Sequence, residues 1–251
     1  MSDTTNNQTS SSVDLQVLNN VDHADLKVIT RRGAEFGDMT MHTLVLPFEF
    51  RDVQTCYPIL FQADAAGQMY PLALFGFEEN ENLFLKDGLW RAPYIPAMIR
   101  RGPFAVGLKD ATNEAGERVQ TRLLSVDMNH PRISRHEGEP LFKPLGGRSE
   151  FLDEHATLLE NLHDGMEHCK GFANALAELG LLESVTLQIT LNDGSANQLI
   201  GFSSINEEKV QELPGGTLED LSRQGYLLPL FMVIASTSNM RTLIDFKNES
   251  L

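Results

Sequence analysis

The chain has 251 residues, of which 41% are hydrophobic and 22% charged, and its formal net charge at pH 7 is −15. This length supports one large domain or two small ones, and the composition argues against a mainly disordered chain. The acidic balance excludes a general nucleic-acid binder, because such a protein needs cationic surface to displace counterions from phosphates. We therefore expect a soluble, acidic α+β protein with no nucleic-acid partner.

The N-terminal tail and the longest apolar stretch predict where in the cell the protein is located. Residues 1–12 are almost all polar and uncharged, which predicts a disordered tail, and they lack the basic and apolar regions of a secretory signal. The longest apolar stretch, Leu227 to Ala235, contains Pro229 and is too short to cross a bilayer. These features predict a cytoplasmic protein without a membrane span, and they leave secretion without a signal open.

Residues 13–147 are predicted to be mainly β-structure. A short strand over 43–47 is followed by a hairpin over 58–77, whose loop contains Gly67. A second hairpin is predicted over 104–126, with a polar tip that ends at Gly116. The Pro- and Gly-rich loop over 129–147 then gives the best candidate boundary in the chain.

Residues 148–251 are predicted to be rich in α-helix. Ser149 is a good N-cap, and apolar side chains recur at helical spacing after it. Gly165 is expected to interrupt this helix, and Gly180 to end a second one. The remaining predicted elements are a hairpin over 185–202, a short helix over 217–225 and a last helix over 229–247. The fold class is α+β, with antiparallel hairpins in the N-terminal half and centre packed with C-terminal helices, as one compact unit or two closely packed subdomains.

Cys56 and Cys169 are the only cysteines, and they are far apart in the sequence. This pattern predicts two free, buried thiols in a reducing compartment, with one long-range disulfide as the alternative.

The charge is unevenly spread along the chain. The net charge is −8 over residues 1–90, +4 over 91–148 and −11 over 149–251. The basic middle could complement the acidic helices of the C-terminal part. It could also form a site for an anion or an acidic peptide, since guanidinium groups bind carboxylate or phosphate bidentately. The predicted ligand-binding residues are Trp90, Tyr94, Arg100, Arg101, His130, Arg132 and Arg135.

The aromatic residues of this set belong to Trp90-Arg-Ala-Pro-Tyr94, which precedes Arg100-Arg-Gly-Pro-Phe104. Aromatic rings next to guanidinium groups are typical of stacking and phosphate contacts in nucleic-acid binders. The two prolines and the acidic flanks favour instead a structural corner in which arginine packs on aromatic rings.

A weak metal-binding pattern is also present. His23-Ala-Asp25 matches part of a site with two histidines and one carboxylate, and His130 or His136 could supply the second imidazole. The alternative is that His23 and Asp25 are turn or capping residues. We predict no cofactor, with non-haem iron or zinc as the alternative. Because the sequence contains no nucleophile elbow, dinucleotide fingerprint or Walker loop, no catalytic residue is assigned.

Several segments together resemble the SapC family of bacterial proteins, over about residues 15–247. The segments that carry the resemblance are Leu18–Val28, Tyr57–Phe61, Leu74–Phe77, Glu81–Leu85, Tyr94–Pro96, Arg100–Phe104, Glu137–Phe142, Gly201–Phe202, Asn206–Lys209 and Ser236–Asn239. The family name implies an association with bacterial surface layers. The family's gene neighbourhood implies an accessory role with a protein partner, such as a halogenase-like flavoprotein or a cupin-like protein, or with an uptake system.

Three hypotheses of function follow. The first is a cytoplasmic, non-enzymatic binding or accessory protein that uses the Arg-rich middle as its contact surface. The second is a metal-dependent, oxygenase-like enzyme. The third is a structural protein associated with a surface layer.

Overall fold

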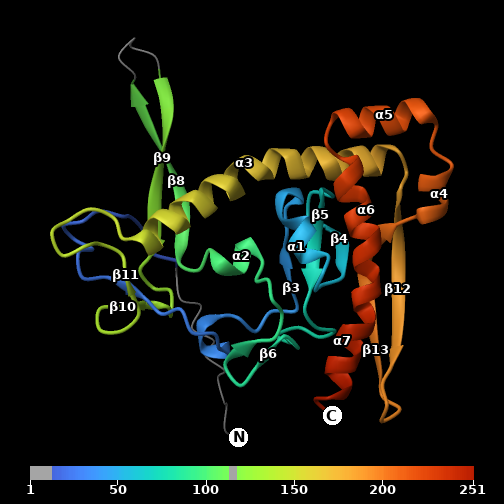
Figure 1. Ribbon diagram of the computed structural model, residues 1–251, viewed down its shortest axis with the longest axis horizontal. Coiled ribbons are helices and arrows are strands. Elements are labelled where there is room, and N and C mark those ends of the chain that lie inside the picture. The colour runs from blue at the N-terminus through green and yellow to red at the C-terminus, as the bar shows by residue number, and fades with distance from the viewer. Residues whose placement is uncertain (1–12, 113–117) are drawn as a thin grey trace, which may run out of the picture. The chain divides into compact units, whose positions relative to one another are not determined.

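The computed structural model describes residues 13–112 and 118–251 and divides the chain into two compact units (Figure 1). Unit 1 is formed by Met1–Thr30 and Arg101–Leu159, and unit 2 by Arg31–Arg100 and Glu160–Leu251. The predicted tail at 1–12 and the hairpin tip that ends at Gly116 lie outside the described residues. The sheets are antiparallel and the C-terminal part is helical, which confirms the predicted α+β class.

Each unit is built from two separate segments of the chain, so neither unit coincides with the regions 13–147 and 148–251. Strand pairing is the physical reason. Strand β1 (Leu15–Val17) pairs with β9 (Arg118–Asp127), which joins the start of the chain to its middle. The sequence boundary reflects a change in local composition, whereas a compact unit is defined by which strands pair.

Unit 1 contains two small sheets. In the first, β9 lies between β1 and β8 (Phe104–Thr112), as the predicted second hairpin requires. In the second, β2 (Lys27–Val28) lies between β10 (Ile133–Ser134) and β11 (Glu139–Pro140). The buried core of the unit consists of Leu26, Val28, Phe104, Val126, Leu141, Leu152 and Leu159.

Unit 2 is organised around a five-stranded sheet with the order β12-β13-β4-β5-β3. Its two hairpins, β4–β5 and β12–β13, confirm the hairpins predicted over 58–77 and 185–202. The strands are β3 (His42–Leu44), β4 (Ile59–Ala63), β5 (Met69–Leu74), β12 (Leu182–Thr190) and β13 (Ala196–Ile205), with a separate pair, β6 (Leu85–Lys86) and β7 (Leu89–Trp90).

The helices of unit 2 are mostly short. The predicted last helix is present, but a 3₁₀ turn divides it into α6 and α7, which lie beside the β12–β13 hairpin (Figure 1). The helical elements are η1 (Ala34–Phe36), η2 (Pro47–Glu49), α1 (Phe50–Val53), α2 (Ala97–Arg100), α4 (Glu207–Gln211), α5 (Gly215–Arg223), α6 (Leu227–Ser236), η3 (Thr237–Asn239) and α7 (Met240–Asn248).

The predicted break at Gly165 is wrong, because α3 runs without interruption from Glu150 to Glu178. Residues 150–159 of this helix belong to unit 1 and residues 160–178 to unit 2. A Cβ atom at position 165 would lie 3.1 Å from side-chain atoms of Leu46 and Phe48. Glycine therefore leaves room here for the side chains of Leu46 and Phe48 and does not end the helix.

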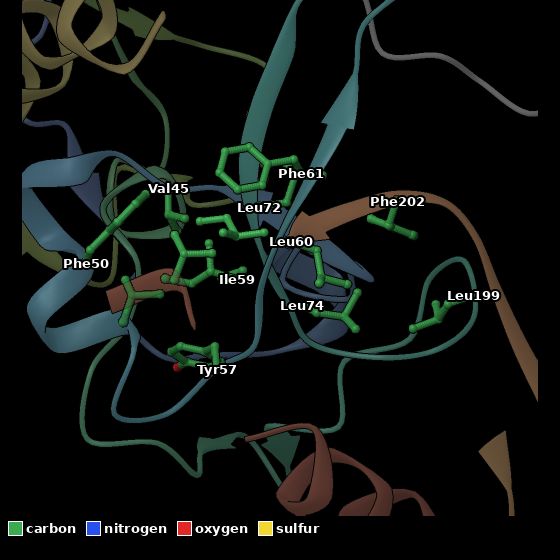
Figure 2. Packing of buried hydrophobic residues seen from close by; sticks show 14 of the residues in the cluster. Val45, Phe50, Tyr57, Ile59, Leu60, Phe61, Leu72, Leu74, Leu199 and Phe202 are labelled. Atoms are coloured by element: carbon green, nitrogen blue, oxygen red, sulfur yellow. The ribbon is translucent and has the colours of Figure 1, made fainter. Parts of the chain in front are cut away.

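The core of unit 2 contains most of the buried hydrophobic side chains among the residues that the structure describes. Figure 2 shows that Leu199 and Phe202 of β13 belong to the same cluster as Leu60 and Leu74. Cys56 and Cys169 are both free and buried, which confirms the predicted thiols. Burial raises the pKa of Cys169 to about 12, so this thiol stays protonated at neutral pH.

Among the described residues, one helical stretch, Leu227–Asn248, is long and apolar enough to cross a membrane by length and composition alone. This is weak evidence, since the core helix of a soluble protein passes the same test. Leu230, Val233 and Leu243 of this stretch pack into the core of unit 2.

Candidate functional site

A pocket of about 480 Å³ opens beside the sheet of unit 2. Its volume lies within the range of about 300–1,000 Å³ that is usual for sites of small molecules. Its lining combines apolar side chains with amides, one imidazole and one carboxylate. The lining residues are Thr40, Met41, His42, Gln62, Glu79, Asn80, Gln198, Leu199, Ile200 and Phe202.

Strand pairing and one turn bring these residues together. His42 is held by the β3–β5 ladder, where it lies opposite Leu74. The turn that carries Asn80 has a left-handed backbone at that residue, with φ 61°. Lys247 anchors the turn from α7, because its Nζ lies 2.9 Å from Glu78 Oε1 and also bonds to Glu81.

All but one of the polar side chains of the pocket are unengaged in the described part of the chain; the exception is Thr40, whose Oγ1 donates to the backbone oxygen of His42 at 2.9 Å. The amides of Gln62, Asn80 and Gln198, the imidazole of His42 and the carboxylate of Glu79 make no side-chain hydrogen bond or ion pair there. Because they are unengaged, their donors and acceptors are available to a ligand.

The charge of the pocket favours cations over anions. Glu79 is exposed and is the charged member of the lining, in which no described residue is Lys or Arg. Burial lowers the pKa of His42 below its usual value of 6.5. The ring, which packs edge-on against Phe202 at 5.9 Å, is therefore neutral at pH 7 and both donates and accepts hydrogen bonds.

The lowered pKa of His42 makes a prediction about stability. A depressed histidine pKa contributes stability that is present above pH 6.5 and is lost as the pH falls toward the lower pKa of the folded state. We therefore expect the free energy of unfolding of His42→Gln to rise relative to that of the unmodified protein as the pH falls below 6.5. Urea denaturation followed by the fluorescence of Trp90, the single tryptophan, measures this difference. A difference that does not change with pH would contradict the prediction.

The predicted arginine site is divided between the two units. Arg100 is exposed at the end of α2 in unit 2, whereas Arg101, Arg132 and Arg135 belong to unit 1. Arg132 is 4% exposed, and its Nη1 donates to the carbonyl oxygen of Ile29 at 2.9 Å. Arg135 forms an ion pair with Asp25.

Arg101 differs from its neighbours in unit 1. Its Nε atom is buried and has no hydrogen-bond partner in the described part of the chain. Burial lowers the pKa of this guanidinium. His130, the other predicted contact, accepts a hydrogen bond on Nδ1 from the backbone of Arg132 at 3.1 Å. The structure therefore brings His130 and Arg132 together and leaves the Arg101 donor unused.

The two aromatic residues of the predicted site have structural partners in unit 2. Trp90 Nε1 donates to the hydroxyl of Tyr57 at 2.7 Å, and the Tyr94 hydroxyl donates to Glu49 Oε2 at 2.8 Å. Arg91 lies over the ring of Phe246, with Cζ 3.6 Å from the ring centroid. This segment has the geometry of the structural corner that the prolines favour.

The predicted metal-binding residues are not placed around a common point. The Nδ1 atom of His23 accepts a hydrogen bond from the backbone of Asn19 at 3.2 Å, as in the turn alternative, while Asp25 is paired with Arg135. The exposed His136 lies in the turn after β10, where its backbone N–H donates to Ser134 Oγ. Across residues 13–112 and 118–251, no group of three or more His, Cys, Asp or Glu side chains could hold a metal ion.

The pocket residues were missed by sequence reasoning. His42, Gln62, Asn80 and Gln198 come from four separate segments, and each one alone is an ordinary polar residue of a strand or turn. The available signal was weak: a polar residue next to apolar strand positions, as in Phe61-Gln62 and Gln198-Leu199.

Comparison with known proteins gives one result. The family model described as SapC matches residues 18–243, which is most of the chain. No curated protein and no solved structure matches it. The match includes segments of both units and all of the lining residues of the pocket. The chain therefore belongs to the SapC family.

Proposed function

We propose that this SapC-family protein is a non-enzymatic binding protein with an accessory role, and that it binds a small polar amine in the pocket of unit 2. The observation that carries the proposal is the set of unengaged polar side chains around that pocket. Unengaged amides beside an apolar floor are suited to a ligand that both hydrogen-bonds and buries apolar surface.

The charge of the lining supports an amine in particular. Glu79 supplies one negative charge and the neutral His42 opposes no cation, whereas an anion would meet no positive partner among the described lining residues. A carboxylate–ammonium pair near the surface contributes modestly, so the neighbouring amides are expected to supply most of the specificity.

Isothermal titration of the full chain with agmatine and spermidine tests the proposal. We expect at least one amine to bind with a Kd of about 1 mM or lower, and Glu79→Gln to weaken that binding by roughly threefold. Glu212→Gln, an exposed glutamate on α4's C-terminal side, is the matched control and should bind as the unmodified protein does. If neither amine binds, or if Glu79→Gln leaves the Kd unchanged, the proposal is wrong.

A second candidate ligand is an anion or an acidic peptide at the Arg-rich middle, as the sequence predicts. The unpartnered Nε of Arg101 favours it, because a buried guanidinium N–H that lacks an acceptor gains from an incoming oxygen. Titration with inorganic phosphate, done in the same way, distinguishes the two candidates. If the anion site exists, phosphate binds, Arg101→Ala abolishes the binding, and Glu79→Gln does not affect it. That this protein works with a protein partner, and that it is located in the cytoplasm, both stay predictions.

A further inference from the structure

The outer edge of strand β12 is long and open. This strand is the first in the sheet order of unit 2, so β13 is its strand neighbour on one side only. No described segment forms a hydrogen bond with its other side. A long edge with unpaired N–H and C=O groups is a template for another strand, and proteins usually shorten or charge such edges.

β12 lacks the usual protection of an edge. Its sequence, Leu-Glu-Ser-Val-Thr-Leu-Gln-Ile-Thr over 182–190, contains no Pro, Lys or Arg, and Glu183 is its one charged residue. The β12–β13 hairpin has one irregularity, and it is an extra residue in β13. Between the pairs Val185–Phe202 and Leu187–Leu199, two residues of β13 lie opposite one residue of β12. The opposite edge of the sheet, β3, has only three residues. Of the two edges, β12 is thus the one that is suited to pairing.

The hairpin hydrogen bonds show which backbone groups of β12 point outward. Leu191 N donates to Ser195 O, and Asn206 N donates to Leu181 O, both at 2.8 Å. Since hydrogen-bonded pairs alternate in an antiparallel ladder, the odd-numbered residues of β12 bond to β13. The even-numbered residues, from Leu182 to Thr190, therefore direct their N–H and C=O groups toward the open edge.

We propose that a second copy of this chain pairs antiparallel with β12 across a two-fold axis at Thr186. In this register every outward N–H and C=O group from Leu182 to Thr190 gains a partner. Such an isologous contact matches one surface patch with itself. The two sheets join into one continuous antiparallel sheet.

The side chains are compatible with this register. Val185 lies opposite Leu187 of the second copy, and both already pack at the margin of the unit 2 core. Thr186 meets its own counterpart on the polar face, and Thr–Thr pairs are favourable across strands. Glu183 lies opposite Ile189, so the two Glu183 carboxylates are at opposite ends of the interface. No like charges of β12 face each other.

Sedimentation velocity of the full chain tests the proposal. We expect a species of twice the 28.0 kDa chain mass. Thr186→Lys and Thr186→Glu, which place like charges on the two-fold axis, should each sediment as the single chain. An equimolar mixture of the two variants should regain the double mass, because Lys then faces Glu. This recovery also separates a broken interface from a misfolded variant.

Gln224→Lys is the matched control, because it makes the same charge change on an exposed residue at the end of α5. It should sediment as the unmodified protein does. Hydrogen exchange should show slow amides at Ser184, Thr186 and Gln188 in the unmodified protein and fast ones in Thr186→Lys. A single-chain mass for the unmodified protein, or a double mass that survives Thr186→Lys, would overturn the proposal.

Discussion

Replacing Glu49 with alanine is expected to lower the free energy of unfolding of unit 2 by about 3 kcal/mol. Glu49 is 2% exposed, and its carboxylate accepts hydrogen bonds from Leu46 N at 3.1 Å and from the Tyr94 hydroxyl and Ala97 N at 2.8 Å each. Alanine would leave these donors without an acceptor. Urea denaturation followed by Trp90 fluorescence measures the change, since Trp90 belongs to the same unit.

The control for this prediction is Glu212→Ala. Glu212 is exposed, and its side chain makes no hydrogen bond or ion pair in the described part of the chain. Its replacement should change the free energy of unfolding by no more than about 0.5 kcal/mol. Equal effects of the two substitutions would show that the buried contacts of Glu49 contribute little to stability.

The same carboxyl also makes stability depend on pH. Burial raises the pKa of Glu49 above its usual value of 4.5, although its hydrogen bonds act in the opposite direction. A raised pKa contributes stability that is fully present below pH 4.5 and is lost as the pH rises through the pKa of the folded state. The stability of the unmodified protein relative to Glu49→Gln should therefore decline above pH 4.5.

Replacing Gly138 with alanine is expected to destabilise unit 1 by about 3 kcal/mol. The glycine has φ 106°, and a Cβ atom there would lie 2.3 Å from the backbone oxygen of Val28. Because the obstacle is backbone of the central strand β2, it cannot move without breaking the β10-β2-β11 sheet. Hydrogen exchange at the amides of Ile29 and Leu141, which bond across this region, measures the loss of protection.

Gly147→Ala is the control that separates backbone strain from the steric clash with Val28. Gly147 also has a left-handed backbone, with φ 84°, but a Cβ atom there would have no neighbour within 4 Å. Its replacement should cost only the conformational strain, about 1 kcal/mol. If Gly138→Ala were no more harmful than Gly147→Ala, the close approach to Val28 would not be the reason for the glycine.

The fold was predictable wherever the signal is local. The hairpins β4–β5, β8–β9 and β12–β13 were predicted from alternating side chains and from turn residues. Gly165 misled the prediction because glycine weakens an isolated helix, whereas here α3 tolerates it next to Leu46 and Phe48. Those two side chains are more than a hundred residues away in the sequence, so no window around Gly165 contains them.

The candidate site was predictable to a smaller extent. The guanidinium-rich segments were visible as a local excess of charge, but their partners were not. The structure gives Arg132 a backbone carbonyl, gives Arg135 the carboxylate of Asp25, and leaves Arg101 Nε unengaged. A charge count sums side chains along the chain, whereas a binding site depends on distances between segments that are remote in sequence.

The net charge of −15, the α+β class and the resemblance to SapC were determined by the sequence by itself. Each of these follows from composition, from periodicity over a few residues, or from motifs in order along the chain. Only the tertiary structure decided that His42, Gln62, Asn80 and Gln198 share one pocket and that β12 keeps an open edge. The physical reason is that both features arise from the pairing of distant strands, which depends on their joint burial in one core.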